Sequence, residues 1–192
     1  MIELVSGSYI TRFDLTTIFG RIAPLQVDLG CGEGSFLCEL GELNPEKIFL
    51  GIERLASRVA KTSRKAARID NVRVLHAETS YAVRYLLPKR SVETFYLLFP
   101  DPWPKRRHHR RRIFTPEFLN SVHAALNDDG VLRIATDHRD YFTYIHRLAG
   151  QSTDFATTEM NGRFPASTFE KRFQRRGVPI YRLTLRKISP VM

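Results

Sequence analysis

Residues 25–34, LQVDLGCGEG, decide the fold class of this 192-residue chain. A mostly apolar run of strand length leads into a loop in which Gly30, Gly32 and Gly34 alternate with other residues. Residues 35–41 then have helical character. Glycines at a strand-to-helix turn let the backbone turn tightly and approach a ligand without a Cβ atom in the way. The stretch predicts the first strand–loop–helix unit of an α/β fold.

The alternation of strand and helix continues along the chain. Further apolar runs of strand length occupy residues 47–53, 71–78, 91–100 and 130–137. Segments of helical period follow them, at residues 54–68, 79–87, 116–126 and 138–149. The tail adds strand-like residues 155–160 and 178–187 around an irregular, arginine-rich segment. Repeated βα units predict a mostly parallel, seven-stranded sheet with helices on both faces.

The positive charge is concentrated in two segments. The chain carries 30 Lys and Arg against 20 Asp and Glu, a net charge of +10. Residues 105–112 hold six of the basic residues, residues 171–187 hold seven, and neither segment contains an acid. The rest of the chain has 17 basic and 20 acidic residues. This pattern favours a polyanionic partner, nucleic acid first; the alternative is a solvated surface that serves solubility.

The composition argues against several other classes. Cys31 and Cys38 cannot form a disulfide framework, and six scattered His show no metal-ligand spacing, so no metal is expected. The N-terminus lacks the regions of a signal peptide, and the longest strongly apolar run, residues 95–99, is far too short to cross a bilayer. We therefore expect a cytoplasmic protein with no membrane partner.

Carboxylates at strand ends strengthen the interpretation of the glycine loop as a cofactor site. Glu53 ends the second strand, 19 residues after Gly34, where a carboxylate can accept hydrogen bonds from both ribose hydroxyls. Glu78 ends the third strand, where it can meet an adenine amino group. The spacing is Gly-x-Gly-x-Gly after Asp28, and an acidic rim would oppose the pyrophosphate of a dinucleotide. S-adenosylmethionine, with its ammonium and sulfonium cations, suits these acids better.

Residues 99–112, FPDPWPKRRHHRRR, join a carboxylate to the first basic segment. They follow the fourth strand, so Asp101 is expected at the same edge of the sheet as the glycine loop. Three prolines restrict the loop around it, and the only tryptophan, Trp103, lies between two of them. The following basic residues can grip phosphates. The stretch therefore predicts an active-site loop that continues into a nucleic-acid surface.

The order of these motifs resembles that of one known family. DLGCGEGSF, GIE, NVRVLHAE, FPDPWPKRRHHRRR, GVLRIATD and STFEKR occur in the order seen in bacterial tRNA (guanine-N7-)-methyltransferases. The resemblance covers about residues 19–187, and the Pro-Asp-Pro-Trp-Pro-Lys block is its most specific part. It implies a Rossmann-like class I fold that uses S-adenosylmethionine to methylate N7 of guanosine 46 in the variable loop of tRNA, with S-adenosylhomocysteine as the other product.

The resemblance also implies roles for individual residues. Cofactor contacts fall on Asp28, Glu53, Glu78 and Asp101, to which the loop adds Gly30 and Gly32. Asp101 also corresponds to the catalytic residue. Substrate-binding positions are Lys105, Asp137, Ser167, Thr168, Phe169 and Glu170. The RNA-contacting segment comprises Arg107, His108, His109, Arg110, Arg111 and Arg112. The chain departs from the family at Asp28 and Glu78, where Glu and Asp respectively are usual.

The implied chemistry needs positioning more than it needs a base. N7 of guanine has an in-plane lone pair and no proton to lose, so transfer depends on in-line placement of N7 behind the methyl group. A carboxylate can stabilise the positive charge that develops on the guanine ring and accept hydrogen bonds from its donor edge. Asp101 or Asp137 can fill that role, and the sequence leaves the choice open.

Some features allow two interpretations. Trp103, Phe164 and Phe169 are candidates for stacking on a base, although core packing is favoured for Trp103. Residues 54–68 form an amphipathic helix with a basic stripe, which consists of Arg54, Arg58, Lys61, Lys65 and Arg68. This basic stripe either extends the RNA surface or is a solvated helix face, and the second interpretation is favoured.

We expect one domain over residues 1–192. It comprises an N-terminal segment (1–23), a cofactor-binding core (24–150) and a C-terminal part with strands and a substrate-binding segment (151–192). The resemblance implies tRNA as the partner and either a monomer or a homodimer as the assembly. Two alternative functions stay open, namely a methyltransferase of the same fold that acts on another acceptor, and a non-catalytic RNA-binding module with a degenerate site.

Overall fold

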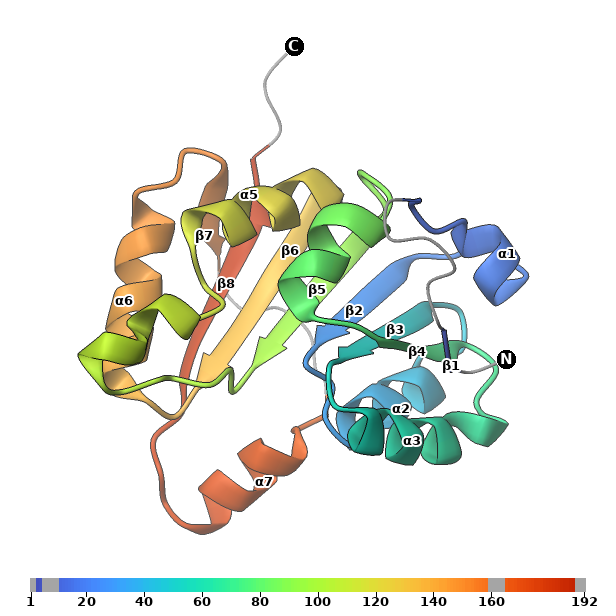
Figure 1. Cartoon of the computed structure of the whole chain (residues 1–192), viewed down its shortest axis with the longest axis horizontal. Helices are drawn as coiled ribbons and strands as arrows, with labels where there is room; N and C mark the ends of the chain where they lie inside the picture. Colours follow the sequence, from blue (N-terminus) through green and yellow to red (C-terminus); the bar gives the residue numbers. More distant parts are fainter. Residues whose placement is uncertain (1–2, 5–10, 159–164, 189–192) are drawn as a thin grey trace.

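The computed structural model describes residues 3–4, 11–158 and 165–188, which form one eight-stranded sheet flanked by helices (Figure 1). The strands are β1 (Glu3–Leu4), β2 (Leu25–Leu29), β3 (Ile48–Glu53), β4 (Val72–His76), β5 (Val92–Leu98), β6 (Leu126–Thr136), β7 (Phe155–Thr158) and β8 (Tyr181–Lys187). The helices are α1 (Leu15–Phe19), α2 (Ser35–Leu43), α3 (Ala56–Lys65), α4 (Thr79–Tyr81), α5 (Pro116–Ala125), α6 (Arg139–Gly150) and α7 (Thr168–Arg175). Three short segments of 3₁₀ or π type are η1 (Ala66–Arg68), η2 (Ala82–Leu86) and η3 (Arg106–Arg111).

The strand order determines where a ligand can bind. The sheet runs β1-β4-β3-β2-β5-β6-β8-β7, and all neighbours are parallel except the two pairs that include β8. From β2 the chain continues to one side through β3 and β4, and then to the other side through β5 and β6. Ligands of such sheets bind outside the carboxyl ends of the strands at this reversal. The loops after β2 and β5 therefore adjoin the expected site.

Helices cover both faces of the central strands. Every residue of β2 and β3 is buried, as the nearly continuous apolar sequence of parallel strands requires. Alternate residues of β3 belong to two apolar clusters, Ile48, Leu50 and Ile52 to one and Phe49 to the other. The first cluster includes α1, η2, α5 and α6, and the second includes α2 and α3.

The expected fold class is confirmed, but the sheet has eight strands and not the seven predicted. The additional strand is β1, in which Glu3 and Leu4 pair with Val74 and Leu75 of β4. It lies within the segment 1–23, for which no strand was expected. Two residues contain no alternation long enough for sequence analysis to detect.

Helix α7 occupies part of the segment that was expected to be irregular. Ser167 Oγ caps it by accepting a hydrogen bond from the backbone N of Glu170 at 3.1 Å. Phe169 and Phe173 lie on one face and pack on Phe99, with ring centroids 6.1 and 5.3 Å from that of Phe99. The helix therefore depends on a tertiary contact with the end of β5, which is distant in sequence.

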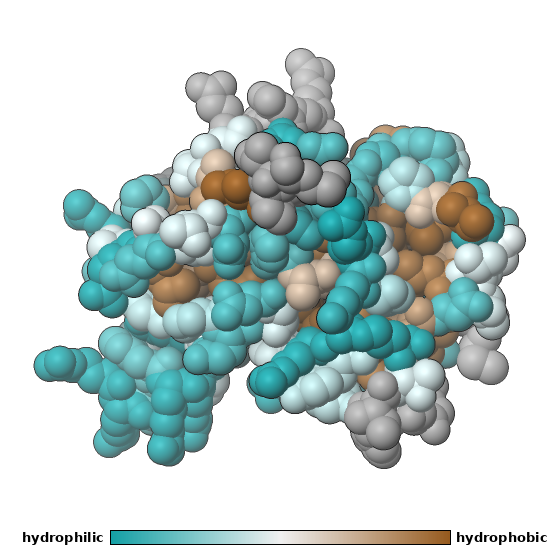
Figure 2. Space-filling model, turned by 90° about the horizontal axis from the view of Figure 1, so that it is seen from above, coloured by the Kyte–Doolittle hydropathy of each residue, from teal (hydrophilic) through white to brown (hydrophobic). Residues whose placement is uncertain are grey.

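The amino ends of the strands, opposite the edge at which a ligand is expected, carry paired charges. Lys47 Nζ lies 2.7 Å from Glu93 Oε2, and Arg90 forms an ion pair with Asp128. Seen from above, the side on which β5 and β6 begin, hydrophilic and apolar side chains are interspersed (Figure 2).

Within the part of the chain that the structure describes, no helix is both long and apolar enough to cross a membrane.

Candidate active site

The loop after β2 contains three glycines with positive φ angles, +80° at Gly30, +58° at Gly32 and +74° at Gly34. A Cβ atom at Gly30 or Gly32 would meet nothing within 4 Å, so the start of the loop exposes bare backbone. A Cβ atom at Gly34 would lie 2.5 Å from Cγ2 of Thr62. The Thr62 hydroxyl donates a hydrogen bond to the Gly32 carbonyl at 3.1 Å. The loop is therefore open to a ligand at its start and packed against α3 at its end.

The basic stripe of α3 also contacts this loop. Lys61 forms an ion pair with Glu33, and Lys65 Nζ donates a hydrogen bond to Ser35 Oγ at 2.7 Å. The Lys61 charge and its hydrogen bond hold the pKa of Glu33 below its usual value. Part of the stripe therefore stabilises the glycine loop, a role that neither interpretation of the sequence included.

Two buried carboxylates lie beside the loop. Asp28 is 5% exposed, and no described residue makes a hydrogen bond to its side chain. Burial, together with the negative charge of Glu53, raises the pKa of Asp28 to about 7. Glu53 is 4% exposed and accepts hydrogen bonds from the backbone N of Gly32 at 3.1 Å and of Leu55 at 2.8 Å. A pair of adjacent buried carboxylates favours a cationic ligand over an anionic one.

Glu78 follows β4, beside the end of β3 in the sheet. It is exposed and caps α4, because its two oxygens accept hydrogen bonds from the backbone N of Ser80 at 3.0 Å and of Tyr81 at 2.7 Å. Each oxygen retains a lone pair beyond these bonds. The predicted cofactor contact at Glu78 is therefore compatible with its role as a helix cap.

Asp101 lies in the loop after β5, across the reversal from the glycine loop. The backbone N of Phe99 donates a hydrogen bond to the Ala135 carbonyl at 2.7 Å, which holds the start of the loop on β6. The φ angles of Phe99 and Trp103 are +53° and +43°. Such angles cost non-glycine residues roughly 1–3 kcal/mol each. A strained, proline-rich loop therefore presents the exposed Asp101 at the edge of the sheet.

The basic run continues from this loop as η3. Arg111 and His108 pack on Trp103, with the Arg111 guanidinium carbon 4.9 Å and the His108 ring 5.7 Å from its ring centroid. Trp103 is half-buried under this turn and does not belong to the main core. The exposed basic side chains are Lys105, Arg106, Arg107, His109, Arg110 and Arg111.

Arg112 differs from the rest of the run because it is only 6% exposed. Its Nε donates a hydrogen bond to the Pro102 carbonyl at 2.8 Å. Its guanidinium carbon lies 4.8 Å from the ring centroid of Tyr141 and 5.2 Å from that of Tyr144. This burial leaves Arg112 little free surface for the contact with RNA that the resemblance implies.

Helix α7 crosses the carboxyl edge below the ends of the strands (Figure 1). Lys171 lies 3.0 Å from Glu39 of α2, and Glu170 forms an ion pair with Arg182 of β8. Glu170 is 6% exposed and therefore holds the helix in place, whereas Phe169 is 51% exposed. Of the two predicted substrate contacts, Phe169 is the one accessible from outside.

The other predicted substrate residues lie along the same edge. Lys105 is exposed at the start of η3, and Asp137 is half-buried directly after β6. Ser167 is 7% exposed and occupied as the cap of α7. The side chain of Thr168 and all of Phe164 lie outside the described residues, so the structure does not test their predicted roles.

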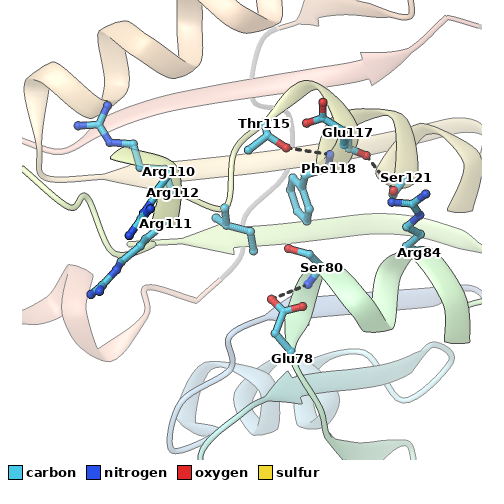
Figure 3. Close-up of a pocket in the computed structure, with 11 residues that line it drawn as sticks. Glu78, Ser80, Arg84, Arg110, Arg111, Arg112, Thr115, Glu117, Phe118 and Ser121 are labelled. Atoms are coloured by element: carbon cyan, nitrogen blue, oxygen red, sulfur yellow. Dashed lines mark hydrogen bonds between the residues drawn. The ribbon is translucent and has the colours of Figure 1, made fainter. Parts of the chain in front are cut away.

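A cavity of about 320 Å³ opens between α4, η3 and α5 (Figure 3). Glu78 lies on one side of it and Arg110 and Arg111 lie on another, and Thr115 and Phe118, at the start of α5, also line it. A predicted cofactor contact and three predicted RNA contacts, Arg110, Arg111 and Arg112, therefore line one recess. The buried carboxylates of the glycine loop do not line it.

Comparison with known proteins identifies the family. Residues 22–183 match a family model described as "Putative methyltransferase". A tRNA (guanine-N(7)-)-methyltransferase of Halorhodospira halophila is 36% identical over 182 residues, which cover 90% of this chain and 79% of that protein. The chain belongs to the tRNA (guanine-N7-)-methyltransferase family. The resemblance inferred from the sequence motifs is thereby confirmed.

Other members and solved structures extend the comparison. The Arthrobacter sp. relative is 40% identical over 145 residues, but the chain spans only about half of its length, 74% of this chain against 46% of that protein. The Thermotoga maritima relative is 34% identical over 181 residues, which cover 92% of this chain and 58% of that protein. The structure of the 16S rRNA methyltransferase KamB has a TM-score of 0.65 at 18% identity and covers 94% of this chain and 96% of its own. At such identity the likeness shows the methyltransferase fold alone.

Sequence reasoning missed Thr62 as part of the site, and it assigned Arg112, the last residue of the 99–112 motif, to the RNA surface. Thr62 packs against the glycine loop from α3, and Arg112 packs beneath the Asp101 loop. The sequence contains no signal for Thr62, because nothing in a helical threonine indicates which loop it meets. Arg112 is hidden in a run of similar residues, and only its burial separates it from them.

Proposed function

We propose that this protein transfers the methyl group of S-adenosylmethionine to N7 of a guanosine in tRNA, and that the target is guanosine 46 in the variable loop. The observation that carries the proposal is the loop after β5, which presents Asp101 beside the reversal of the sheet and continues directly into exposed cations. Family membership supports the substrate class and the acceptor atom. The position rests on the resemblance of the motifs.

The residues around the glycine loop fit S-adenosylmethionine. The bare backbone at Gly30 and Gly32 leaves room for it, and an ammonium group can provide the partner that the buried Asp28 lacks. Glu53 retains lone pairs for ribose hydroxyls beyond its two backbone hydrogen bonds. Anionic phosphates would meet two buried carboxylates here, which disfavours a dinucleotide. When bound, S-adenosylmethionine supplies an electrophilic methyl group.

Asp101 takes an electrostatic role in this mechanism. N7 would donate its lone pair to the methyl group that bound S-adenosylmethionine would supply, and positive charge would develop on the guanine ring. The Asp101 carboxylate stabilises that charge, and the proline-rich loop holds it in place before the reaction. Asp137, at the end of the next strand, accepts hydrogen bonds from N1–H and the amino group of guanine. No proton is removed from the reacting atom, so Asp101 is not a general base.

The exposed cations of η3 and α7 bind the tRNA backbone. Helix α7 turns Phe169 and Phe173 toward Phe99, and its arginines face outward. The exposed set comprises Lys105, Arg106, Arg107, Arg110, Arg111, Arg172, Arg175 and Arg176. Phe169, half of whose surface is exposed, can stack on a base that leaves the folded tRNA.

The test is to incubate the purified protein with S-adenosylmethionine and an unmodified tRNA transcript, and to map 7-methylguanosine by mass spectrometry. A transcript with adenosine at position 46 is the matched control. We expect one 7-methylguanosine, at position 46, in the first transcript and none in the second. Product at another guanosine would overturn the position. Absence of product from a preparation that binds both tRNA and S-adenosylmethionine would overturn the reaction. A preparation that binds tRNA but not S-adenosylmethionine would favour the RNA-binding module.

A further inference from the structure

The buried Arg112 connects the Asp101 loop to helix α6. Its Nε–Pro102 hydrogen bond is the only one that the structure records for residues 100–104 among the described residues. Three of those five residues are prolines, which have no N–H group to donate. The loop therefore has few ways of fixing its own backbone, and a side chain from outside the loop provides one.

The same guanidinium group of Arg112 packs against two tyrosine rings of α6. The rings of Tyr141 and Tyr144 are stacked at 29° with centroids 6.1 Å apart, and the guanidinium packs over both. Tyr141 is fully buried, and its hydroxyl accepts a hydrogen bond from the backbone N of Phe114 at 3.4 Å. A planar guanidinium stacked on two rings loses little further freedom when it donates to the loop.

Asp101 and Arg112 act on the same side chain. Burial raises the pKa of Tyr141 to about 12, the charge of Arg112 lowers it, and the charge of Asp101 raises it. Asp101 therefore lies within electrostatic reach of the tyrosine against which Arg112 packs. Because Phe99 and Trp103 hold strained φ angles at the two ends of this loop, its shape needs support from its surroundings.

We propose that Arg112 is a positioning residue that holds the Pro100–Pro104 loop, and with it Asp101, against α6, and that it takes no part in binding tRNA. The inference rests on the proposed function, because its readout is methyl transfer. It separates Arg112 from its neighbours Arg110 and Arg111, which carry the same charge but lie exposed.

The experiment compares Arg112→Gln with Arg110→Gln, two variants that remove the same charge two residues apart. For Arg112→Gln we expect kcat at saturating tRNA to fall at least about tenfold, while Kd for the tRNA transcript and its salt dependence stay within twofold of wild type. For Arg110→Gln we expect a higher Kd for tRNA and a weaker dependence of that Kd on salt. Wild-type kcat in Arg112→Gln, or a Kd that rises as in Arg110→Gln, would overturn the proposal.

Arg112→Lys distinguishes geometry from charge. Lysine keeps the positive charge but lacks the planar group that stacks on two rings while donating to Pro102. We expect Arg112→Lys to resemble Arg112→Gln in kcat; full rescue by lysine would mean that charge alone matters, against the proposal. If both variants fail to fold, Tyr144→Leu removes one of the two rings against which Arg112 packs. A fall in kcat without a change in tRNA affinity is then expected. A wild-type protein that transfers no methyl group to tRNA would instead contradict the proposed function.

Discussion

Two basic segments near the carboxyl edge of the sheet, namely η3 with its flank and the basic stripe of α3, differ in what their cations contact. In η3 and its flank, Lys105 and the arginines up to Arg111 are exposed, and none of them forms an ion pair with a described residue. In the basic stripe of α3, Lys61 is paired with Glu33 and Lys65 with the Ser35 hydroxyl. The first segment is available to an external polyanion, whereas the second is partly used inside the protein. A run of like charges therefore acquires its role from the acceptors that folding brings to it.

The largest effect is expected at Asp101, which precedes η3. Asp101→Asn removes the charge that stabilises the alkylated guanine, so kcat should fall by roughly 10²–10³-fold with little change in tRNA affinity. Single-turnover kinetics and tRNA binding measure the two quantities. Asp129→Asn, which changes an exposed carboxylate near the amino edge, is the control and should leave both unchanged. Near-normal turnover of Asp101→Asn would refute the electrostatic role.

The next effect concerns Asp28, on the α3 side of the reversal. Its folded pKa of about 7 lies above the ordinary value of 3.8, so ligand-free protein should lose stability as pH rises from about 4 through 7. A cationic ligand needs the ionised form, so S-adenosylmethionine affinity should fall as pH decreases through 7, with proton release on binding. Calorimetry in buffers of different ionisation enthalpy measures that release.

Asp28→Asn is the matched variant for this prediction. It keeps the shape of the side chain and cannot ionise, so ligand-free protein should melt higher than wild type at pH 8 and show a weaker dependence of Tm on pH. Its affinity for S-adenosylmethionine should fall about tenfold or more. Equal Tm profiles for variant and wild type would show that Asp28 is not the group that titrates.

Two double variants compare the basic segments directly. Arg106→Gln with Arg110→Gln should weaken tRNA binding about tenfold and reduce the slope of log K against log salt by about 1.5, because two phosphate contacts are lost. Lys61→Gln with Lys65→Gln should leave that slope unchanged and weaken S-adenosylmethionine binding a few-fold. If both pairs change the tRNA slope equally, the two segments do not differ in function.

The smallest effects are expected on stability within the α3 contact. Lys61→Gln removes an exposed ion pair and should change the free energy of unfolding very little, because solvent screens the pair. Thr62→Val keeps the shape of a fully buried side chain but leaves the Gly32 carbonyl without its hydrogen bond, and should cost about 1–2 kcal/mol. Urea unfolding measures both. A larger loss for Lys61→Gln would contradict this order.

Local sequence predicted the elements whose boundaries local chemistry determines. Strand β2 spans Leu25–Leu29 as expected, because an apolar run that meets a glycine loop marks both of its ends. Helix α5 begins at Pro116 as expected, where Thr115 caps it through the backbone N of Phe118. Strand β6 was expected from Gly130 but begins at Leu126, because the turn-like residues between them bulge within the strand.

Long-range contacts explain what the sequence did not predict. Helix α7 is stabilised by Phe99 and by the ion pair of Glu170 with Arg182, neither of which its own eight residues reveal. Arg112 looks like its neighbours until the packing on Tyr141 is known. The positions of the carboxylates at the strand ends were therefore predictable, whereas the residues that pack against their loops depend on tertiary packing.

The paired charges of the amino edge affect how a partner first meets the protein. Lys47 with Glu93 and Arg90 with Asp128 cancel there, whereas the cations of η3 stay exposed at the other end of the strands. The exposed cations of η3 therefore attract a polyanion to the end of the strands that carries Asp101. A polyanionic partner that diffuses nearby is drawn to this end, which aligns it with the Asp101 edge before contact. Salt screens this alignment, so it should speed association most at low ionic strength.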